Sequence, residues 1–307
     1  MSAASKEDGS NRVILLALTA NFGIAVAKLV GAFFTQSASL LAEGIHSLAD
    51  CTNQIFLLIG AKQSKKPADD LHPLGYGRES FFWSFMVALL LFSMGGLFAI
   101  YEGIHKLKAD AMTIQYPWVG LTILLVALGL EGASFLACLK EIKGQNQYPS
   151  LWIWFRKSTA SELIVIFIED FAALIGLSLA LLFLVISIVT ENTKWDAIGS
   201  IVIGTLLVFV AYILAREVKS LLVGEKSSTD YRAFVVNHLK TLDSGMHILN
   251  ILSVVTGSDE VLLTMKIHPG KVSNSYELID AINVLEANIK KQFPEVRWLF
   301  VEPDIHD

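Results

Sequence analysis

Three ionisable side chains, Glu43, His46 and Asp50, stand three and four residues apart in the stretch SLLAEGIHSLADCTNQ. In a helix, this spacing places all three along one face. The stretch runs directly into the apolar sequence IFLLIGA, which indicates a helix in a lipid bilayer. A charged side chain at the bilayer centre costs about 2.5–3.5 kcal/mol on insertion scales, so such residues mark ion or proton paths. The pattern therefore predicts a site for a cation.

A second acidic pair lies in a later apolar segment, IFIEDFAALIG, which contains Glu169 and Asp170. Two helices that present carboxylates at a similar depth can share one dication, with Asp170 facing His46 and Asp50. The mixed nitrogen and oxygen ligands suit zinc and also cobalt, iron or manganese. The alternative is a set of structural hydrogen bonds between helices. It fits the set less well, because several acids would repel one another without a cation or protons.

Two further polar residues stand in apolar segments. Glu131, in LGLEGASF, has small neighbours that favour close helix packing. We expect it either to assist a proton path or to accept a structural hydrogen bond. Lys28 is a candidate counter-charge for the acids, and the open alternative is that its ammonium group snorkels to the membrane interface.

The composition indicates a membrane domain followed by a smaller aqueous one. Of 307 residues, 53% are hydrophobic and only 17% are charged, whereas soluble domains average about 25% charged residues. We expect a cytoplasmic N-terminal tail over residues 1–12, a transmembrane domain over 13–222 and a cytoplasmic domain over 223–307. The N-terminal sequence lacks a signal-peptide cleavage pattern. A net charge of −5 without a basic stripe argues against nucleic acid as a partner.

Six segments approach the roughly 20 apolar residues that cross a bilayer. They are about Val13–Thr35, Ser37–Ala61, Ser80–Gly103, Trp118–Leu139, Ser161–Val189 and Ala197–Leu214. Lysine and arginine are concentrated in the loops on one side, so the positive-inside rule predicts both termini in the cytoplasm. Cys51 and Cys138 have no CxxC spacing and predict neither a disulfide framework nor a thiolate zinc site.

The remaining chain reads as helix, strand, strand, helix, strand. The predicted bounds are about 229–242, 248–256, 261–268, 275–292 and 297–301. Pro294 ends the second helix, and the sequence GSDE joins the first two strands. This order predicts a small α+β sandwich with helices on one sheet face.

Several motifs together resemble the cation diffusion facilitator family of metal transporters. They are TQSASLLAEGIHSLADCTNQ, PADDLHPLGYGRES, IEDFAALIG and WDAIGSIVIG, and they look closest to the branch that contains the mitochondrial zinc transporter nine. The resemblance implies a homodimer, each protomer a bundle of six transmembrane helices with a C-terminal ferredoxin-like cytoplasmic domain. It also implies exchange of a cytoplasmic divalent cation, Zn²⁺ first, for protons. The metal is then a substrate, with no cofactor and no enzymatic activity, and a bacterial inner membrane is the expected location.

The resemblance further implies a transport site built from two residues of the second span and two of the fifth. His46, Asp50 and Asp170 match that pattern, but the second histidine of the family falls at Ile166. Glu169 and Glu43 are both open as replacements. Because such ligands must be deprotonated, metal binding is expected to release protons and to weaken as the pH falls.

A second family site, in the loop between the second and third spans, is incomplete here. Asp69 or Asp70 and His72 are present, while Tyr76 replaces a histidine. Weak regulatory metal binding and a structural turn are the two interpretations. No metal pair is expected in the cytoplasmic domain, because the strand positions there are mostly apolar.

Three other functions compete with zinc export. A manganese, iron or cobalt exporter is favoured by the acids of the fifth span. A membrane metal sensor would bind without transporting. An intramembrane hydrolase has the least support, since the sequence has no HExxH motif and no nucleophile paired with a base.

Overall fold

The computed structural model describes residue 18 and residues 21–109, 116–144, 150–158, 161–241, 245–272 and 274–306. The predicted N-terminal tail lies outside the described residues. The chain forms two compact units, one of residues 1–59, 83–147 and 162–217 and the other of residues 60–82, 148–161 and 218–307. The domain limits expected from the sequence stay a prediction.

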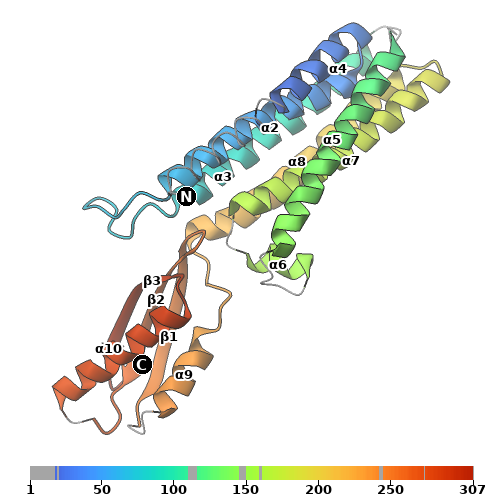
Figure 1. Ribbon diagram of the computed structural model, residues 1–307. Coiled ribbons are helices and arrows are strands. Elements are labelled where there is room, and N and C mark those ends of the chain that lie inside the picture. Colours follow the sequence, from blue (N-terminus) through green and yellow to red (C-terminus); the bar gives the residue numbers. More distant parts are fainter. Residues whose placement is uncertain are drawn as a thin grey trace, which may run out of the picture. The chain divides into compact units, whose positions relative to one another are not determined.

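Long helices make up the first unit and are drawn in Figure 1. Up to residue 223 the described helices are Asn21–Thr35, α2 (Ala38–Gln63), α3 (Glu79–Leu90), η1 (Leu91–Leu97), α4 (Phe98–Lys108), α5 (Pro117–Gly144), α6 (Leu151–Lys157), α7 (Ser161–Val189) and α8 (Lys194–Val223). Of these, the short helix α6 belongs to the second unit. Within the described residues, four helices are long and apolar enough to cross a membrane: Glu79–Lys108, Pro117–Gly144, Leu163–Val189 and Lys194–Val223. Helix α2 is long enough, but its polar residues lower its hydropathy. Six spans therefore stay a prediction.

The bundle has a continuous apolar core and an apolar exterior. Leu40, Leu124 and Leu177 are among its fully buried side chains. Phe33 and Leu136 are 72% and 66% exposed on the outside. Large apolar side chains on both the inside and the outside of a helix bundle are typical of helices surrounded by lipid.

Asp196, in the first turn of α8, holds the start of α2. One carboxylate oxygen accepts a hydrogen bond from Ser37 Oγ at 2.7 Å, and the other accepts one from the Ala38 backbone N–H at 2.5 Å. Ser39 Oγ donates to the Asp196 backbone oxygen at 2.8 Å. The first N–H groups of a helix lack partners within that helix, so Asp196 acts as a cap supplied by another helix. This cap fixes where the polar face of α2 begins.

The helix Glu79–Lys108 contains one wide turn, η1, with π-helical hydrogen bonding. A Cβ atom at Gly96 would lie 2.6 Å from the Val208 side chain, so the glycine lets this turn approach α8 closely. A Cβ atom at Gly95 would lie 3.8 Å from Nδ1 of His46. Short π-helical turns frequently occur at functional sites, and this one borders the polar face of α2.

The second unit contains a three-stranded sheet covered by helices on one face (Figure 1). Its elements are α9 (Tyr231–Thr241), β1 (His247–Gly257), β2 (Glu260–His268), α10 (Ser275–Gln292) and β3 (Val296–Pro303). Strand β2 is central; it pairs antiparallel with β1 and parallel with β3. The order of elements agrees with the sequence pattern. A ferredoxin-like fold has a further strand before its first helix, so that description stays a prediction.

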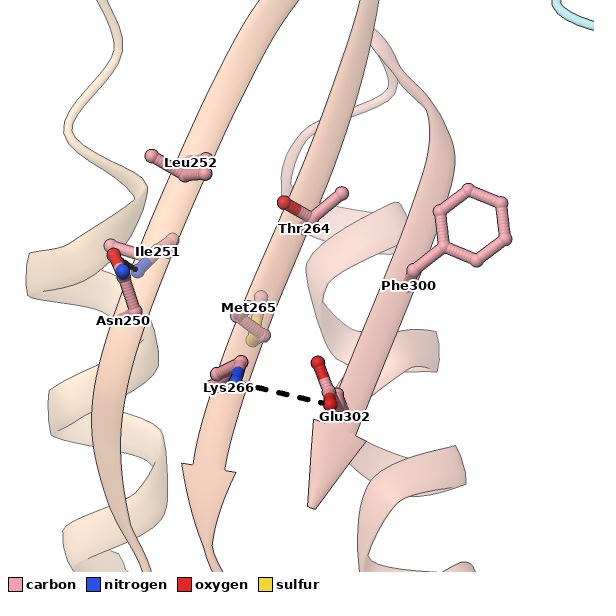
Figure 2. Close-up of a pocket in the computed structure, with 8 residues that line it drawn as sticks. All are labelled: Asn250, Ile251, Leu252, Thr264, Met265, Lys266, Phe300 and Glu302. Atoms are coloured by element: carbon pink, nitrogen blue, oxygen red, sulfur yellow. Dashed lines mark hydrogen bonds and ion pairs between the residues drawn. The ribbon is translucent and has the colours of Figure 1, made fainter. Parts of the chain in front are cut away.

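The opposite face of this sheet carries a hollow of about 320 Å³, shown in Figure 2. The hollow is lined by Asn250, Ile251, Leu252, Thr264, Met265, Lys266, Phe300 and Glu302. Leu252 and Phe300 are 62% and 58% exposed there, and Lys266 Nζ lies 3.9 Å from Glu302 Oε1.

Candidate metal centre

Helix α2 presents four polar side chains along one face: Glu43, His46, Asp50 and Asn53. They recur at intervals of three and four residues, so they form one stripe. Nδ1 of His46 lies 3.6 Å from Oδ1 of Asp50. Both ring nitrogens of His46 and Oδ1 of Asp50 are buried without a hydrogen-bond partner in the part of the chain that the structure describes. Such atoms are rare in folded proteins, and a bound water or ion is one of their ordinary explanations.

A cavity of about 40 Å³ lies beside this stripe. Its walls come from helix Asn21–Thr35, α2, α5 and α7. They are formed by Asn21, Ser47, Asp50, Gln54, Glu131, Ser134, Ile166, Glu169, Asp170 and Ala173. The volume is sufficient for an ion or a water molecule, since one water needs about 10–15 Å³. Four carboxylic acids therefore converge on one small space inside the helical unit.

Two acids of α7 enter the cavity with defined partners. Glu169 accepts a hydrogen bond from Asn53 Nδ2 at 2.5 Å, and Asp170 accepts one from Ser134 Oγ at 3.0 Å. Oδ1 of Asn53 is buried without a partner within the described residues. Ile166 stands one turn before Asp170 and gives this wall an apolar surface.

Glu43 lies outside the cavity. Its Oε2 is 3.5 Å from Nζ of Lys28, and both side chains are fully buried. The Lys28 ammonium group also donates a hydrogen bond to Ser47 Oγ at 2.7 Å. A snorkelling lysine keeps its charged group in water, so the buried position of Lys28 fits the counter-charge alternative.

His46 does not line the cavity; it contacts the site through Asp50. Within the described residues, no three His, Cys, Asp or Glu side chains are arranged to hold a metal ion. An ion at this position would therefore require side-chain rotations that bring the His46 ring and the carboxylates together.

Comparison with known proteins identifies the family. The model of the cation efflux transmembrane domain matches residues 14–223. The chain belongs to the cation diffusion facilitator family. It is therefore a multi-pass membrane protein of a family of metal transporters, and the family resemblance of its motifs is confirmed.

Several curated relatives are similar over much of this facilitator. Metal tolerance protein C4 of Arabidopsis thaliana is 32% identical over 240 residues, which is 75% of this chain and 51% of the plant protein. The mitochondrial proton-coupled zinc antiporter SLC30A9 of Xenopus laevis is 28% identical over 333 residues, 96% of this chain and 59% of that protein. Magnetosome protein MamB of Magnetospira sp. (strain QH-2) is 29% identical over 183 residues, 59% and 61% of the two chains. The chain thus spans about half to three fifths of the length of these relatives.

The loop after α2 of this facilitator is organised around Asp69. Its Oδ1 accepts the backbone N–H groups of Leu71 and His72 at 3.0 and 2.7 Å, and its Oδ2 accepts the Tyr76 hydroxyl at 2.7 Å. The hydrogen bond from Tyr76 and those from the backbone lower the pKa of Asp69. The loop is therefore stabilised above the ordinary pKa of aspartate, and this contribution is lost as the pH falls through the lowered value.

These contacts favour the structural interpretation of the loop. The predicted metal candidates are Asp69 or Asp70 together with His72, and in the structure Asp69 caps the turn. The His72 and Tyr76 rings lie 4.2 Å apart between centroids, so Tyr76 fills the space beside His72. Metal binding in this loop stays untested.

Sequence reasoning missed several polar residues that line the cavity or contact its acids. Asn53 extends the α2 stripe one turn beyond Asp50, and that periodicity was a usable signal. Asn21 and Ser134 are small polar residues in largely apolar segments, a weaker signal. Gln54 lies four residues after Asp50, so the same periodicity places it on the face of Asp50 at the cavity.

Proposed function

We propose that this facilitator exports a divalent metal cation, with zinc as the first candidate, in exchange for protons. The observation that carries the proposal is the convergence of Asp50, Glu131, Glu169 and Asp170 on one small cavity within the helices. Acids at this density repel one another unless protons or a cation compensate their charge. The names of the SLC30A9 relatives, proton-coupled zinc antiporters, support the same cargo and coupling.

We assign the ligands as His46 and Asp50 from α2 and Asp170 and Glu169 from α7. Glu169 takes the role left vacant at Ile166, because its carboxylate lines the cavity and is held there by Asn53. Glu43 is less suited to that role, because its carboxylate is paired with Lys28.

Competition between metal and protons is sufficient to couple the two fluxes. The dication binds when the carboxylates are ionised and His46 is neutral, so loading releases protons and a high proton concentration favours unloading. Glu131 lines the cavity from α5, and we assign it to the proton path. Alternating exposure of the site to the two sides of the membrane would complete the cycle.

A manganese, iron or cobalt cargo is the second candidate. It is favoured by one observation: the cavity wall carries an isoleucine, Ile166, where the family resemblance implies histidine. The remaining ligands are rich in carboxylate oxygen, which suits manganese better than the softer metals.

Ile166→His is expected to shift metal preference toward zinc, because it adds an imidazole to the cavity wall one turn before Asp170. We expect the affinity for Zn²⁺ relative to Mn²⁺ to rise about tenfold, the size of a modest ligand effect. Isothermal titration with both ions measures this ratio. Ile166→Leu is the control and should keep the original affinity ratio. An unchanged ratio in Ile166→His would contradict the proposal that residue 166 lies beside the bound ion.

We further propose the full architecture that the resemblance implies: six spans per protomer, both termini in the cytoplasm and a ferredoxin-like domain in a homodimer. The sheet face that bears the hollow supports a second copy as partner, since exposed Leu252 and Phe300 flank the opposite charges of Lys266 and Glu302. A two-fold interface brings such a patch against itself. The mass in detergent, against 33.7 kDa for one chain, tests the dimer. A bacterial inner membrane stays the predicted location.

Reconstitution into proteoliposomes tests export directly. With an acidic interior and metal outside, a pH-sensitive dye inside should report proton exit only when Zn²⁺, Mn²⁺, Fe²⁺ or Co²⁺ is added. The metal that gives the highest kcat/KM identifies the cargo. Metal binding without any proton flux would favour the sensor alternative over transport.

A further inference from the structure

Lys28 is a fully buried cation within the helical unit. Its side chain is 0% exposed, and its ammonium group contacts two residues of α2, Ser47 Oγ at 2.7 Å and Glu43 Oε2 at 3.5 Å. Burying an ammonium group is costly unless it is paired and hydrogen-bonded. Because the Lys28 ammonium group is buried despite this desolvation cost, we expect a role beyond packing.

The lysine lies directly behind the wall of the cavity. Ser47 holds the ammonium group and also lines the cavity. Along α2, Ser47 follows His46 and precedes Asp50 by three residues, so the ammonium group is level with the assigned ligands. Lys28 itself is not part of the lining and would not touch the ion.

Glu43 is fixed in place from two sides. Lys28 contacts its Oε2, and α7 approaches its Oε1 at Gly176, where an added Cβ would lie 2.5 Å from that oxygen. The glycine thus leaves the room that the carboxylate occupies. Lys28 and Glu43 therefore hold fixed positions beside the cavity before any ion binds.

We propose that Lys28 is a resident counter-ion of the metal site, which lowers the affinity for the dication enough to permit its release. The inference rests on the proposed function and names a determinant of affinity for that same site. Lys28 acts through the electrostatic field at the cavity, and Glu43 offsets part of its charge.

Charge balance gives the physical reason. Four acids line the cavity, and a dication compensates two charges. A transport site must bind strongly enough to load and weakly enough to unload. A fixed positive charge nearby repels the dication, and the repulsion is large where water is excluded. The two partners should therefore change metal affinity with opposite signs.

The test compares Lys28→Met, Glu43→Gln and the double variant in the full-length protein. Calorimetry in detergent gives Kd for Zn²⁺ and, separately, for Mn²⁺, and proteoliposomes give KM and kcat. We expect Lys28→Met to bind about tenfold more tightly, with KM and kcat both lowered by slow release, and Glu43→Gln to bind about tenfold more weakly. The double variant should return near the wild-type affinity.

Opposite shifts separate this role from a structural one, because a merely structural pair weakens binding whichever partner is removed. Shifts in the same direction, or none, would overturn the proposal. Lys28→Arg keeps the charge and should keep the affinity. If Lys28→Met does not fold, Lys28→Gln replaces it, because its amide can still donate to Ser47: tighter binding supports the counter-ion, and unchanged or weaker binding overturns it.

The same experiment separates this inference from the proposed function. A wild-type protein that binds neither ion would overturn both. If the wild-type protein binds metal but the affinities of Lys28→Met and Glu43→Gln do not shift in opposite directions, only the counter-ion role of Lys28 is overturned.

Discussion

Asp50→Asn is expected to reduce metal affinity at least about 100-fold and to abolish metal-driven proton flux. Asp50 is the carboxylate of α2 that lines the cavity, and it also contacts His46 at 3.6 Å. Asparagine keeps the shape but removes the charge that holds a dication. Removing even an outer partner of a metal ligand costs about 10–100-fold, so loss of a ligand charge should cost more.

Calorimetric titration and proteoliposome flux measure this effect. Glu102→Gln provides a matched control, because the Glu102 side chain is 16% exposed and that of Asp50 is 19% exposed. Glu102 is paired with Lys106 in α4, in an ion pair within its own helix. Near wild-type metal binding and proton flux in Asp50→Asn would show that the cavity is not part of the transport path.

Asp196→Ala is expected to destabilise the helical unit by about 2–4 kcal/mol. The substitution removes the acceptor for Ser37 Oγ and for the first N–H groups of α2, which would remain buried without partners. Loss of a helix cap costs about 0.5–2 kcal/mol, and each buried unsatisfied donor adds about 1–3 kcal/mol. The estimate is below the sum because some donors can find other acceptors.

Thermal unfolding in detergent measures this loss as a lower melting temperature. Thr205→Ala is the control on the same helix; the Thr205 hydroxyl donates to the Ile201 backbone oxygen of its own helix. Its effect should stay within about 0.5 kcal/mol. Equal melting temperatures for the two variants would mean that the cap does not hold α2.

The sequence identified the family and the helices that carry the acids, because these features are local. Spacing along α2 put Glu43, His46 and Asp50 on one face without knowledge of any neighbour. The order of helices and strands in the second unit followed from periodicity and from turn residues such as Pro294. Both types of signal depend only on residues close in the chain.

The sequence could not show in the same way which side chains of different helices contact one another. Whether Lys28 reaches Glu43 or the membrane surface depends on the rotation of two helices about their axes. The same rotation decides that Glu131 lines the cavity while His46 stands beside it. The Asp196 cap joins residues that are 159 positions apart, counted to Ser37. No local pattern specifies such a contact.

The wide turn η1 determines where the helix Glu79–Lys108 can lose a residue without a change in the direction of its side chains. A π-helical turn accommodates one residue more than a regular turn while the helices on both sides keep their facing directions. Deletion of Ser93 would then leave a continuous α-helix with both flanks still in phase. Deletion of Ala88 in α3 would instead rotate one flank by about 100° relative to the other. Natural variation in length along this helix should accordingly be confined to residues 91–97.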